Sequence, residues 1–255
     1  TLEDMTVLPR FYVPTDSPLS TQQELDLPEQ VSRHVQVLRM QPGEQVSVFD
    51  GFGGQWTAEV LVMGRKVVRI AVREHESISR ELPHAVTLAV GMPANDRMDG
   101  LVEKATELGV SAVQPLMCER SVLRLDGERA LKKVAHWQGV AIAAAEQSGR
   151  TCVPVIHEVK TLTQWLKQDR PAGAACGVLS LREAQRIRGW AAGLRQTAER
   201  APVYFLSGPE GGLAPQEEDA VLQQGWQAVS LGARVLRADT APLMALGVMA
   251  ALWEA

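Results

Sequence analysis

The chain has 255 residues, of which 45% are hydrophobic and 22% are charged, and its formal net charge at pH 7 is −4. This composition is that of a globular protein with a sizeable core, which excludes an intrinsically disordered chain. The acidic balance argues against attachment to nucleic acid by bulk charge, but it does not exclude a local basic face.

Residues 1–73 are predicted to form a small β-barrel. Runs of alternating or continuous apolar residues predict strands at residues 10–13, 45–49, 55–62 and 66–72. The glycines at 50–54 predict a hairpin turn. An apolar stripe predicts one helix at residues 28–40. Short strands joined by tight turns are typical of a small barrel, so we expect a separate N-terminal domain.

A polar stretch at residues 74–83 predicts a linker, and residues 84–255 are predicted to form an α/β domain. Strands are expected at residues 86–90, 110–116, 174–180, 203–207 and 228–231. The first expected helix of this domain stops at Gly109. A long helix is expected at residues 128–147, with one stripe formed by Leu131, Val134, Ala135, Gln138 and Ile142. Alternating strands and helices predict a mainly parallel sheet with helices on both faces.

Several kinds of site are not expected. No apolar run approaches the roughly 18 residues that a membrane span needs. The N-terminus lacks the pattern of a signal peptide, so we expect a cytoplasmic protein, and we interpret residues 1–4 as an extension before a natural start at Met5. The three cysteines are widely spaced and the five histidines show no metal-ligand spacing, so we expect no disulfide and no metal.

Two glycine-containing loops near the C-terminus are the strongest functional signal. The first is Ser207-Gly208-Pro209-Glu210-Gly211-Gly212-Leu213, and it follows a predicted buried strand and leads into a predicted helix. Ligands of open α/β sheets bind beyond the carboxyl ends of the strands. Carboxylates at residues 217–219 would repel a phosphate from the following helix, so a neutral or cationic ligand is expected. Alone, the loop is equally well explained as a helix-entry turn.

The second loop combines arginines with apolar residues. It runs from Leu231 to Pro242 and contains Arg234 and Arg237. Apolar side chains beside a few polar groups are typical of ligand pockets, and Gly232 permits close approach to the backbone. Either arginine is also explained as the ion-pair partner of a nearby carboxylate.

These loops resemble the cofactor-binding loops of the SPOUT (trefoil-knot) methyltransferases, and in detail those of the RsmE family of 16S ribosomal RNA (uridine-N3) methyltransferases. The resemblance extends to residues 9–12, 34–40, 49–51, 104–110, 115–121 and 144–150, in the same order. It implies a PUA-like barrel domain followed by a knotted domain. The chain departs from the family at Asp239, where glutamate is usual, and at Ala214, where a Ser or Thr helix cap is usual.

The resemblance implies S-adenosylmethionine (AdoMet) as cofactor, 16S ribosomal RNA in the small subunit as substrate, and a homodimer. The cofactor residues it implies are Leu179, Ser180, Gly208, Pro209, Glu210, Gly211, Leu231, Gly232, Val235, Leu236, Arg237, Thr240 and Ala241. Methylation of uracil N3 requires loss of a proton, so a base or a group that stabilises the uracil anion is needed. Glu210, Asp239, Arg234 and Arg237 are candidates, and we name Arg234, Arg237 and Glu210 as the catalytic ones, with an arginine holding the uracil oxygens or a phosphate. Arginines in family-like motifs and on the barrel are the RNA-binding candidates: Arg10, Arg39, Arg120, Arg124 and Arg150.

Two other functions stay open on the residues alone. One is a SPOUT methyltransferase that modifies another RNA, such as a transfer RNA or the large-subunit RNA. The other is a ribosome-assembly factor that binds RNA without catalysis. The retained glycines and charged residues of both loops favour an enzyme over the assembly factor.

Overall fold

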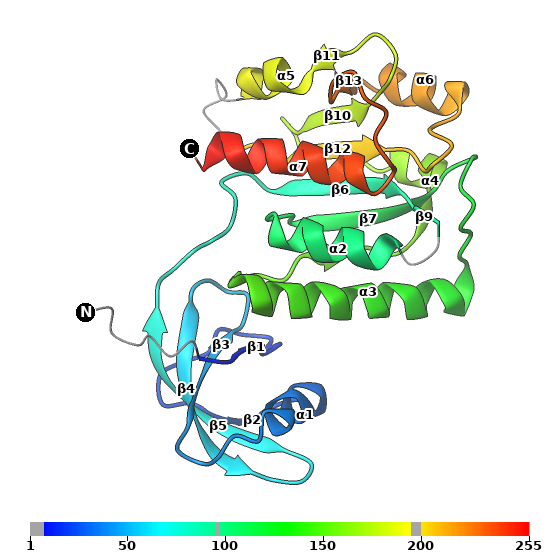
Figure 1. Ribbon diagram of the computed structural model, residues 1–255. Coiled ribbons are helices and arrows are strands. Elements are labelled where there is room, and N and C mark those ends of the chain that lie inside the picture. Colours follow the sequence, from blue (N-terminus) through cyan, green and yellow to red (C-terminus); the bar gives the residue numbers. More distant parts are fainter. Residues whose placement is uncertain (1–7, 95–96, 195–199, 255) are drawn as a thin grey trace. The chain divides into compact units, whose positions relative to one another are not determined.

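A computed structural model describes residues 8–94, 97–194 and 200–254 (Figure 1). The chain forms two compact units. The first comprises the chain up to Glu81 together with Ala145–Val153, and the second comprises Leu82–Ala144 and Pro154–Ala255. The segment Ala145–Val153 therefore belongs with the N-terminal residues, although the sequence pattern places it inside the C-terminal domain.

The first unit contains a five-stranded sheet in the order β1-β3-β4-β5-β2. Its elements are β1 (Arg10–Tyr12), β2 (Glu24–Asp26), α1 (Glu29–Val37), β3 (Gln45–Phe49), β4 (Gln55–Met63) and β5 (Val68–Glu76). β1 pairs with β3 in parallel, whereas the other neighbours are antiparallel. The structure confirms the predicted strands, hairpin and helix. β2 was not predicted because it is a three-residue strand with one apolar residue.

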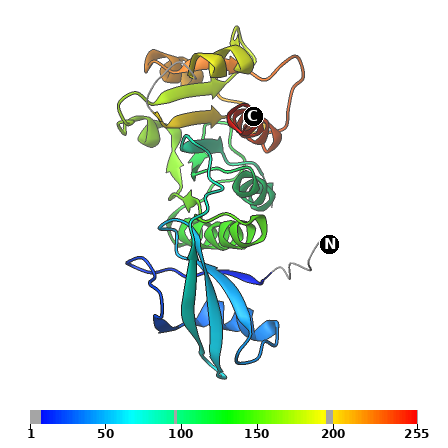
Figure 2. The same cartoon turned by 90° about the vertical axis from the view of Figure 1, so that its left-hand side faces the viewer.

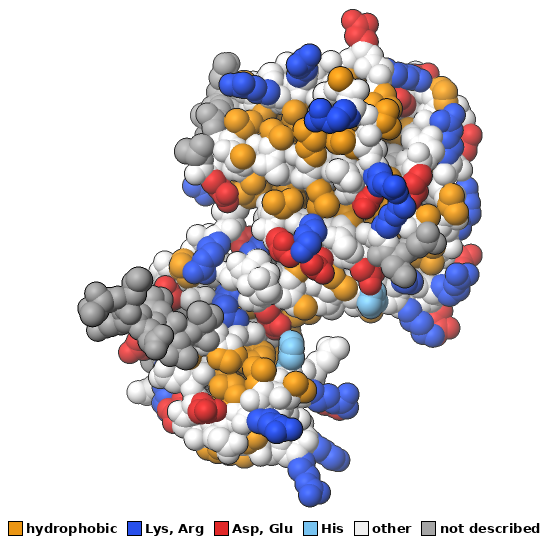
Figure 3. All heavy atoms as spheres, viewed as in Figure 1, with side chains coloured by type: hydrophobic (Ala, Val, Ile, Leu, Met, Phe, Trp, Pro, Cys, Tyr) orange, Lys and Arg blue, Asp and Glu red, His pale blue; other side chains and the backbone are white. Residues whose placement is uncertain are grey.

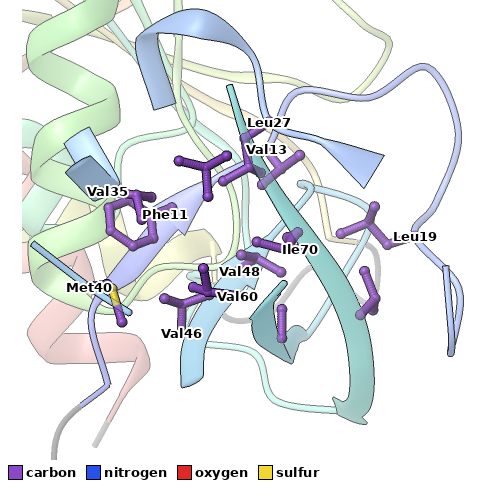
Figure 4. Packing of buried hydrophobic residues seen from close by; sticks show 13 residues of the cluster. Phe11, Val13, Leu19, Leu27, Val35, Met40, Val46, Val48, Val60 and Ile70 are labelled. Carbon is purple, nitrogen blue, oxygen red and sulfur yellow. The ribbon is translucent and has the colours of Figure 1, made fainter. Parts of the chain in front are cut away.

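A single apolar cluster holds the first unit together (Figure 4). Val46, Val48, Val60 and Ile70 project from neighbouring strands and are completely buried. Val35 adds the apolar side of α1, which therefore packs against the sheet. The period-two alternation of β3 to β5 predicts this arrangement because it turns every second side chain to one face.

The second unit contains an eight-stranded sheet in the order β11-β13-β10-β12-β6-β7-β8, with β9 also paired to β7. Its strands are β6 (Val86–Gly91), β7 (Ala112–Met117), β8 (Val155–Ile156), β9 (Lys160–Thr161), β10 (Ala175–Leu179), β11 (Gln185–Arg186), β12 (Val203–Ser207) and β13 (Gln227–Ser230). All of these pairs are parallel. The predicted α/β class is confirmed.

Helices cover both faces of this sheet. They are α2 (Arg97–Glu107), α3 (Gly127–Ser148), α4 (Leu162–Leu166), α5 (Ile187–Leu194), α6 (Pro215–Gln223) and α7 (Thr240–Trp253). Figure 2 shows α2 and α7 on one face, with α4 and α6 on the other. Gly109 follows α2 with a φ of 92°, which confirms the predicted stop.

The C-terminal part of the chain returns to the middle of the sheet. β12 lies between β10 and β6, both of which precede it in the sequence. After β13, which lies between β11 and β10, α7 packs against β12, β6 and α2. A returning C-terminal segment of this kind is what a trefoil knot requires.

The buried side of α3 differs from the predicted stripe. Leu131 is 57% exposed and Ala135 is exposed too, whereas Trp137, Ala141 and Ala144 are buried. Ala141 lies four positions after Trp137 and Ala144 lies three positions after Ala141, so these residues share one face of the helix. The predicted stripe is therefore only partly right, because Val134, Gln138 and Ile142 are half-buried, whereas the fully buried face consists of small alanines around one tryptophan.

Candidate functional site

A pocket of about 570 Å³ opens beyond the carboxyl ends of β10, β12 and β13. The loops after these strands form its walls, as the parallel sheet predicts. Every residue implied as a cofactor contact lines this pocket except Thr240, and Arg234 lines it too. Residues more than fifty positions apart in the chain, such as Leu179 and Leu236, therefore meet at one site.

The glycine-rich loop after β12 has a tightly packed backbone. A Cβ atom on Gly208 would lie 2.6 Å from the Leu213 nitrogen and 2.8 Å from the Gly212 carbonyl carbon. Gly91, at the end of β6, has the same restriction, because a Cβ there would lie 2.5 Å from the Pro209 ring. Gly212 has a φ of 69°, which favours glycine. The loop therefore needs glycine at several positions for different reasons.

Apolar side chains give the pocket a hydrophobic lining. Leu179 and Leu231 are half-buried at the ends of their strands. Leu181 and Val235, from the loops after β10 and β13, are 76% and 78% exposed at the same pocket. Large apolar side chains that are exposed at a pocket indicate a surface that binds a ligand or a partner.

Polar groups at the start of α6 are linked to the loop after β10. Glu218 accepts a hydrogen bond from the Ser180 hydroxyl at 2.5 Å and lies 3.3 Å from the Arg182 Nε. Arg182 also pairs with Asp219 at 2.6 Å. Glu218 and Asp219, whose charges disfavour a phosphate ligand, therefore join the start of α6 to the loop after β10. Glu217 accepts the Ala214 N–H at 3.0 Å, but alanine supplies no acceptor of its own, so half of a capping box is present.

Ser207, at the end of β12, begins the first predicted loop and lines the pocket, although it is not among the implied cofactor residues. Its hydroxyl oxygen is buried and has no hydrogen-bond partner within the described residues. A buried hydroxyl without a partner costs free energy, so this group is suited to a polar ligand atom.

The Glu210 carboxylate already contacts a neighbouring loop, the one that follows β6. It accepts the Ala94 N–H at 2.8 Å and lies 3.6 Å from the guanidinium of Arg97. Arg97 lines the pocket as well, and no sequence pattern identified it. These contacts fit a carboxylate that positions a loop and an arginine better than they fit a general base.

Arg234 and Arg237 are exposed at the pocket, and neither has a side-chain hydrogen bond or ion pair within residues 8–94, 97–194 and 200–254. Asp239 follows them immediately before α7. Its Oδ1 is buried and has no partner among the described residues. The two arginines are therefore available to a bound anion, and Asp239 directs one oxygen away from solvent.

Two RNA-binding candidates lie on the loop that follows β7. Arg120 donates a hydrogen bond to the Gly211 carbonyl at 3.0 Å and lines the pocket. Arg124 donates to the Glu119 carbonyl at 2.9 Å and is otherwise exposed. Arg120 thus braces the glycine-rich loop, while both guanidinium groups stay near the surface.

The first unit contains the other candidates, and two of them are structural. The guanidinium of Arg10 donates to the carbonyls of Ala145, Glu146 and Arg150 at the end of α3, and burial lowers its pKa. Arg150 is only 3% exposed and forms an ion pair with Glu81. This burial corrects the sequence-based expectation, because an arginine enclosed by its own unit does not reach RNA. Arg39 alone of the three is freely exposed.

We expect Arg150→Ala to destabilise the first unit. Removing one partner of a buried ion pair leaves Glu81 uncompensated, which costs about 3 kcal/mol. Chemical denaturation measures the free energy of unfolding. The control is Arg80→Ala, whose exposed side chain donates to the Gly149 carbonyl at 2.8 Å; it is expected to lose about 1 kcal/mol. Wild-type stability of Arg150→Ala would contradict the structural assignment.

The described residues contain no metal-binding cluster and no helix long enough and apolar enough to cross a membrane. The cysteines are free. Cys118 is buried, which raises the pKa of its thiol to about 12. This thiol is therefore un-ionised at neutral pH and unreactive.

Comparison with known proteins places both units in families. Residues 80–250 match the RNA methyltransferase domain family, and residues 27–72 match the RNA methyltransferase PUA domain family. Ribosomal RNA small subunit methyltransferase E of Bacillus subtilis is 33% identical over 224 residues, which are 87% of this chain and 87% of that protein. The protein of that name from Synechocystis is 36% identical over 220 residues, which are 86% of this chain and 69% of its own length.

A solved structure shares the fold of the whole chain. It is the crystal structure of ribosomal RNA small subunit methyltransferase E from Neisseria gonorrhoeae bound to S-adenosyl methionine, with a TM-score of 0.84 and 38% identity. The match covers 96% of this chain and 98% of that one.

Proposed function

Because this chain belongs to the RNA methyltransferase family that includes ribosomal RNA small subunit methyltransferase E, we propose that it transfers a methyl group from AdoMet to N3 of a uridine in 16S ribosomal RNA. The observation that carries the proposal is the pocket beyond β10, β12 and β13, whose apolar walls and glycine-rich loop adjoin two arginines that have no side-chain partner among the described residues. We further propose that the protein acts in the cytoplasm, on the small ribosomal subunit.

The residues of the pocket fit AdoMet. Its volume of about 570 Å³ is within the range of about 300–1,000 Å³ that is usual for small-molecule sites. Leu179, Leu231 and Leu236 offer apolar contacts to an adenine ring, and the unpaired Ser207 hydroxyl offers a hydrogen bond. The remaining contacts would come from backbone groups and from Ser180, Gly208, Pro209, Gly211, Gly232, Val235, Arg237, Thr240 and Ala241. When bound, AdoMet supplies an electrophilic methyl group on a sulfonium.

The protein has two tasks in this reaction. It orients the uracil so that N3 faces the methyl group, and it stabilises the negative charge that appears when N3 loses its proton to solvent water. That charge spreads to the two carbonyl oxygens that flank N3. The bond from N3 to the methyl carbon forms as the bond from that carbon to the sulfonium sulfur breaks. Arg234 and Arg237 are the exposed cations of the pocket that lack side-chain partners in the described chain, so we assign them this stabilising role.

Glu210 is assigned a positioning role. Its bond to the Ala94 N–H and its proximity to Arg97 connect the loop after β6 to the glycine-rich loop. Arg120 braces that loop from the other side through the Gly211 carbonyl. We propose that Arg120 and Arg124 also contact the RNA backbone near the pocket, because arginine is suited to phosphate recognition.

We also propose that the protein is a homodimer that associates through α7. This helix is apolar on all sides, and one side packs on the sheet. Met244, Val248 and Leu252 are only half-buried and lie four positions apart, and Gly247 lies three positions from Met244, so these residues form a second apolar face. An apolar helix face of this kind is suited to a self-complementary interface.

Val248→Glu is expected to convert the dimer to a monomer, because it places a charge in the second apolar face of α7, from which water is excluded in the dimer. Light scattering after size-exclusion chromatography measures the mass of the particle. Lys167→Glu changes an exposed residue elsewhere in the second unit and is expected to leave the mass unchanged. A dimeric Val248→Glu variant would show that the subunits associate elsewhere.

Isothermal titration calorimetry with AdoMet tests the cofactor assignment. We expect one binding site per chain. The absence of binding at millimolar AdoMet would reject the proposed function before any RNA is added.

A further inference from the structure

One pocket residue, Leu181, is neither an implied cofactor residue nor a catalytic candidate. It lines the pocket and is 76% exposed, and no other leucine within residues 8–94, 97–194 and 200–254 is exposed to this extent. In Figure 3, hydrophobic side chains reach the surface over β13 and α7, with Lys or Arg side chains beside them. A large apolar side chain that is held in solvent at a pocket indicates contact with a ligand.

Both neighbours of Leu181 are anchored to other elements. The Ser180 N–H donates to the Val229 carbonyl at 3.0 Å, and the Ser180 hydroxyl donates to Glu218 at 2.5 Å. The same hydroxyl accepts the Arg182 N–H at 3.0 Å, which closes a tight turn around Leu181. The turn is therefore formed before any ligand binds, which lowers the entropic cost of a contact with Leu181.

The charges beside Leu181 disfavour a phosphate. Arg182 lies 3.3 Å from Glu218 and pairs with Asp219 at 2.6 Å. Two carboxylates therefore neutralise one guanidinium, and this side of the pocket has no spare positive charge. The RNA backbone, which carries one negative charge on each phosphate, is not attracted here, whereas the face of a neutral base is suited to an apolar side chain.

The exposure of Leu181 places it nearer the opening of the pocket than the leucines assigned to adenine. Leu179, Leu231 and Leu236 are half-buried, whereas most of Leu181 is in solvent. A cofactor enclosed by the half-buried leucines leaves the exposed leucine to the reactant that arrives from solvent. In methyl transfer to RNA, that reactant is the target base.

We propose that Leu181 packs against one face of the target uracil and holds it out of the RNA stack, while Arg234 and Arg237 contact its carbonyl oxygens. Enzymes that modify a base inside structured nucleic acid extrude it, and the stacking energy of that base is then lost. Contact between the base and a protein side chain offsets part of this loss. The inference rests on the proposed function, which supplies the uridine.

Leu181→Ala tests the contact through the kinetics of methyl transfer. We expect kcat/KM for 16S ribosomal RNA to fall about tenfold, which is the scale of one lost base contact. The AdoMet affinity measured by calorimetry is expected to stay at the wild-type value, because the leucines assigned to adenine are retained. Leu181→Met keeps an apolar side chain of similar volume and is expected to restore most of the rate.

The matched control is Leu131→Ala. It shortens the same type of side chain at an exposed position of α3, outside the pocket, and is expected to retain the wild-type kcat/KM. Leu181→Ala is expected to melt at the wild-type temperature, because little of the Leu181 side chain is buried. A loss of rate in Leu181→Ala is then not a loss of folding.

Fluorescence of 2-aminopurine measures extrusion of the base separately. This base is placed beside the uridine that the wild-type protein methylates, in a synthetic RNA, and its emission rises when its neighbour leaves the stack. S-adenosylhomocysteine replaces AdoMet, so no methyl transfer occurs. We expect the wild type and Leu131→Ala to raise the emission and Leu181→Ala to raise it less. A residue that only stabilised the loop would not lower this signal while AdoMet affinity and melting temperature stayed at the wild-type values.

Two results would overturn the inference. One is that kcat/KM and the emission of Leu181→Ala equal those of Leu131→Ala. The other is a rise in the AdoMet dissociation constant that accounts for the whole loss of rate, which would make Leu181 a cofactor contact. In both cases the wild-type protein still binds AdoMet and methylates RNA, so failure of this inference is distinguishable from failure of the proposed function.

Discussion

Gly208→Ala is expected to weaken AdoMet binding about a hundredfold. The added Cβ would lie 2.6 Å and 2.8 Å from backbone atoms of Leu213 and Gly212, and backbone atoms cannot rotate away as a side chain does. The loop therefore has to move, and with it the pocket wall between β12 and α6. We expect the dissociation constant for AdoMet to rise about a hundredfold, which corresponds to about 2.7 kcal/mol. Calorimetry measures this constant directly.

A matched variant distinguishes this effect from general destabilisation. Gly139 lies within α3, and a Cβ on it would meet nothing within 4 Å. Gly139→Ala is expected to bind AdoMet as the wild type does and to gain up to about 1 kcal/mol in stability. Wild-type AdoMet affinity of a folded Gly208→Ala protein would show that this loop does not form the cofactor site.

Replacement of Arg234 or Arg237 is expected to affect the rate of the methyl-transfer step more than it affects AdoMet binding. Arg234→Ala and Arg237→Ala each remove a cation that we assign to the charge on the deprotonated uracil. Loss of one such group lowers kcat by about 100- to 1,000-fold in comparable sites. We expect Arg234→Ala to retain AdoMet affinity, and lysine at either position to restore part of the rate because it keeps the charge without the planar fork. Single-turnover methyl transfer with saturating RNA measures the rate.

Arg182→Ala is the comparison for these variants. Arg182 lines the same pocket, but Glu218 and Asp219 already neutralise it. Removal of the Arg182 side chain is therefore expected to reduce the rate of methyl transfer less than removal of the Arg234 or Arg237 side chain. An equal loss in all three variants would indicate that the arginines act through loop structure, and the charge-stabilising assignment would then fail.

The sequence predicts the pocket well because its walls are local motifs. Strand, glycine-rich loop and helix follow one another at residues 203–223, and a parallel sheet brings the ends of such strands to one edge. The implied cofactor residues accordingly line one pocket, apart from Thr240. No periodicity indicates the return of α7 to the middle of the sheet, because that path is a property of the whole chain.

Contacts between distant residues explain what the sequence does not predict. Arg97 approaches Glu210 across more than a hundred residues, and the Ser207 hydroxyl is identified only by its burial. Arg150 lies in a family-like motif that suggests RNA contact, yet its side chain is buried against Glu81. Residue type and spacing do not reveal burial when a segment such as Ala145–Val153 packs with a distant part of the chain.

Mapping the modified nucleotide tests the account most directly. The protein is incubated with isotope-labelled AdoMet and either isolated small ribosomal subunits or a 16S ribosomal RNA transcript, and the RNA is digested to nucleosides for mass spectrometry. We predict labelled 3-methyluridine from a single position, and no label in large-subunit or transfer RNA treated in the same way. Label in another nucleoside or another RNA, or RNA binding without any label, would contradict the proposed function.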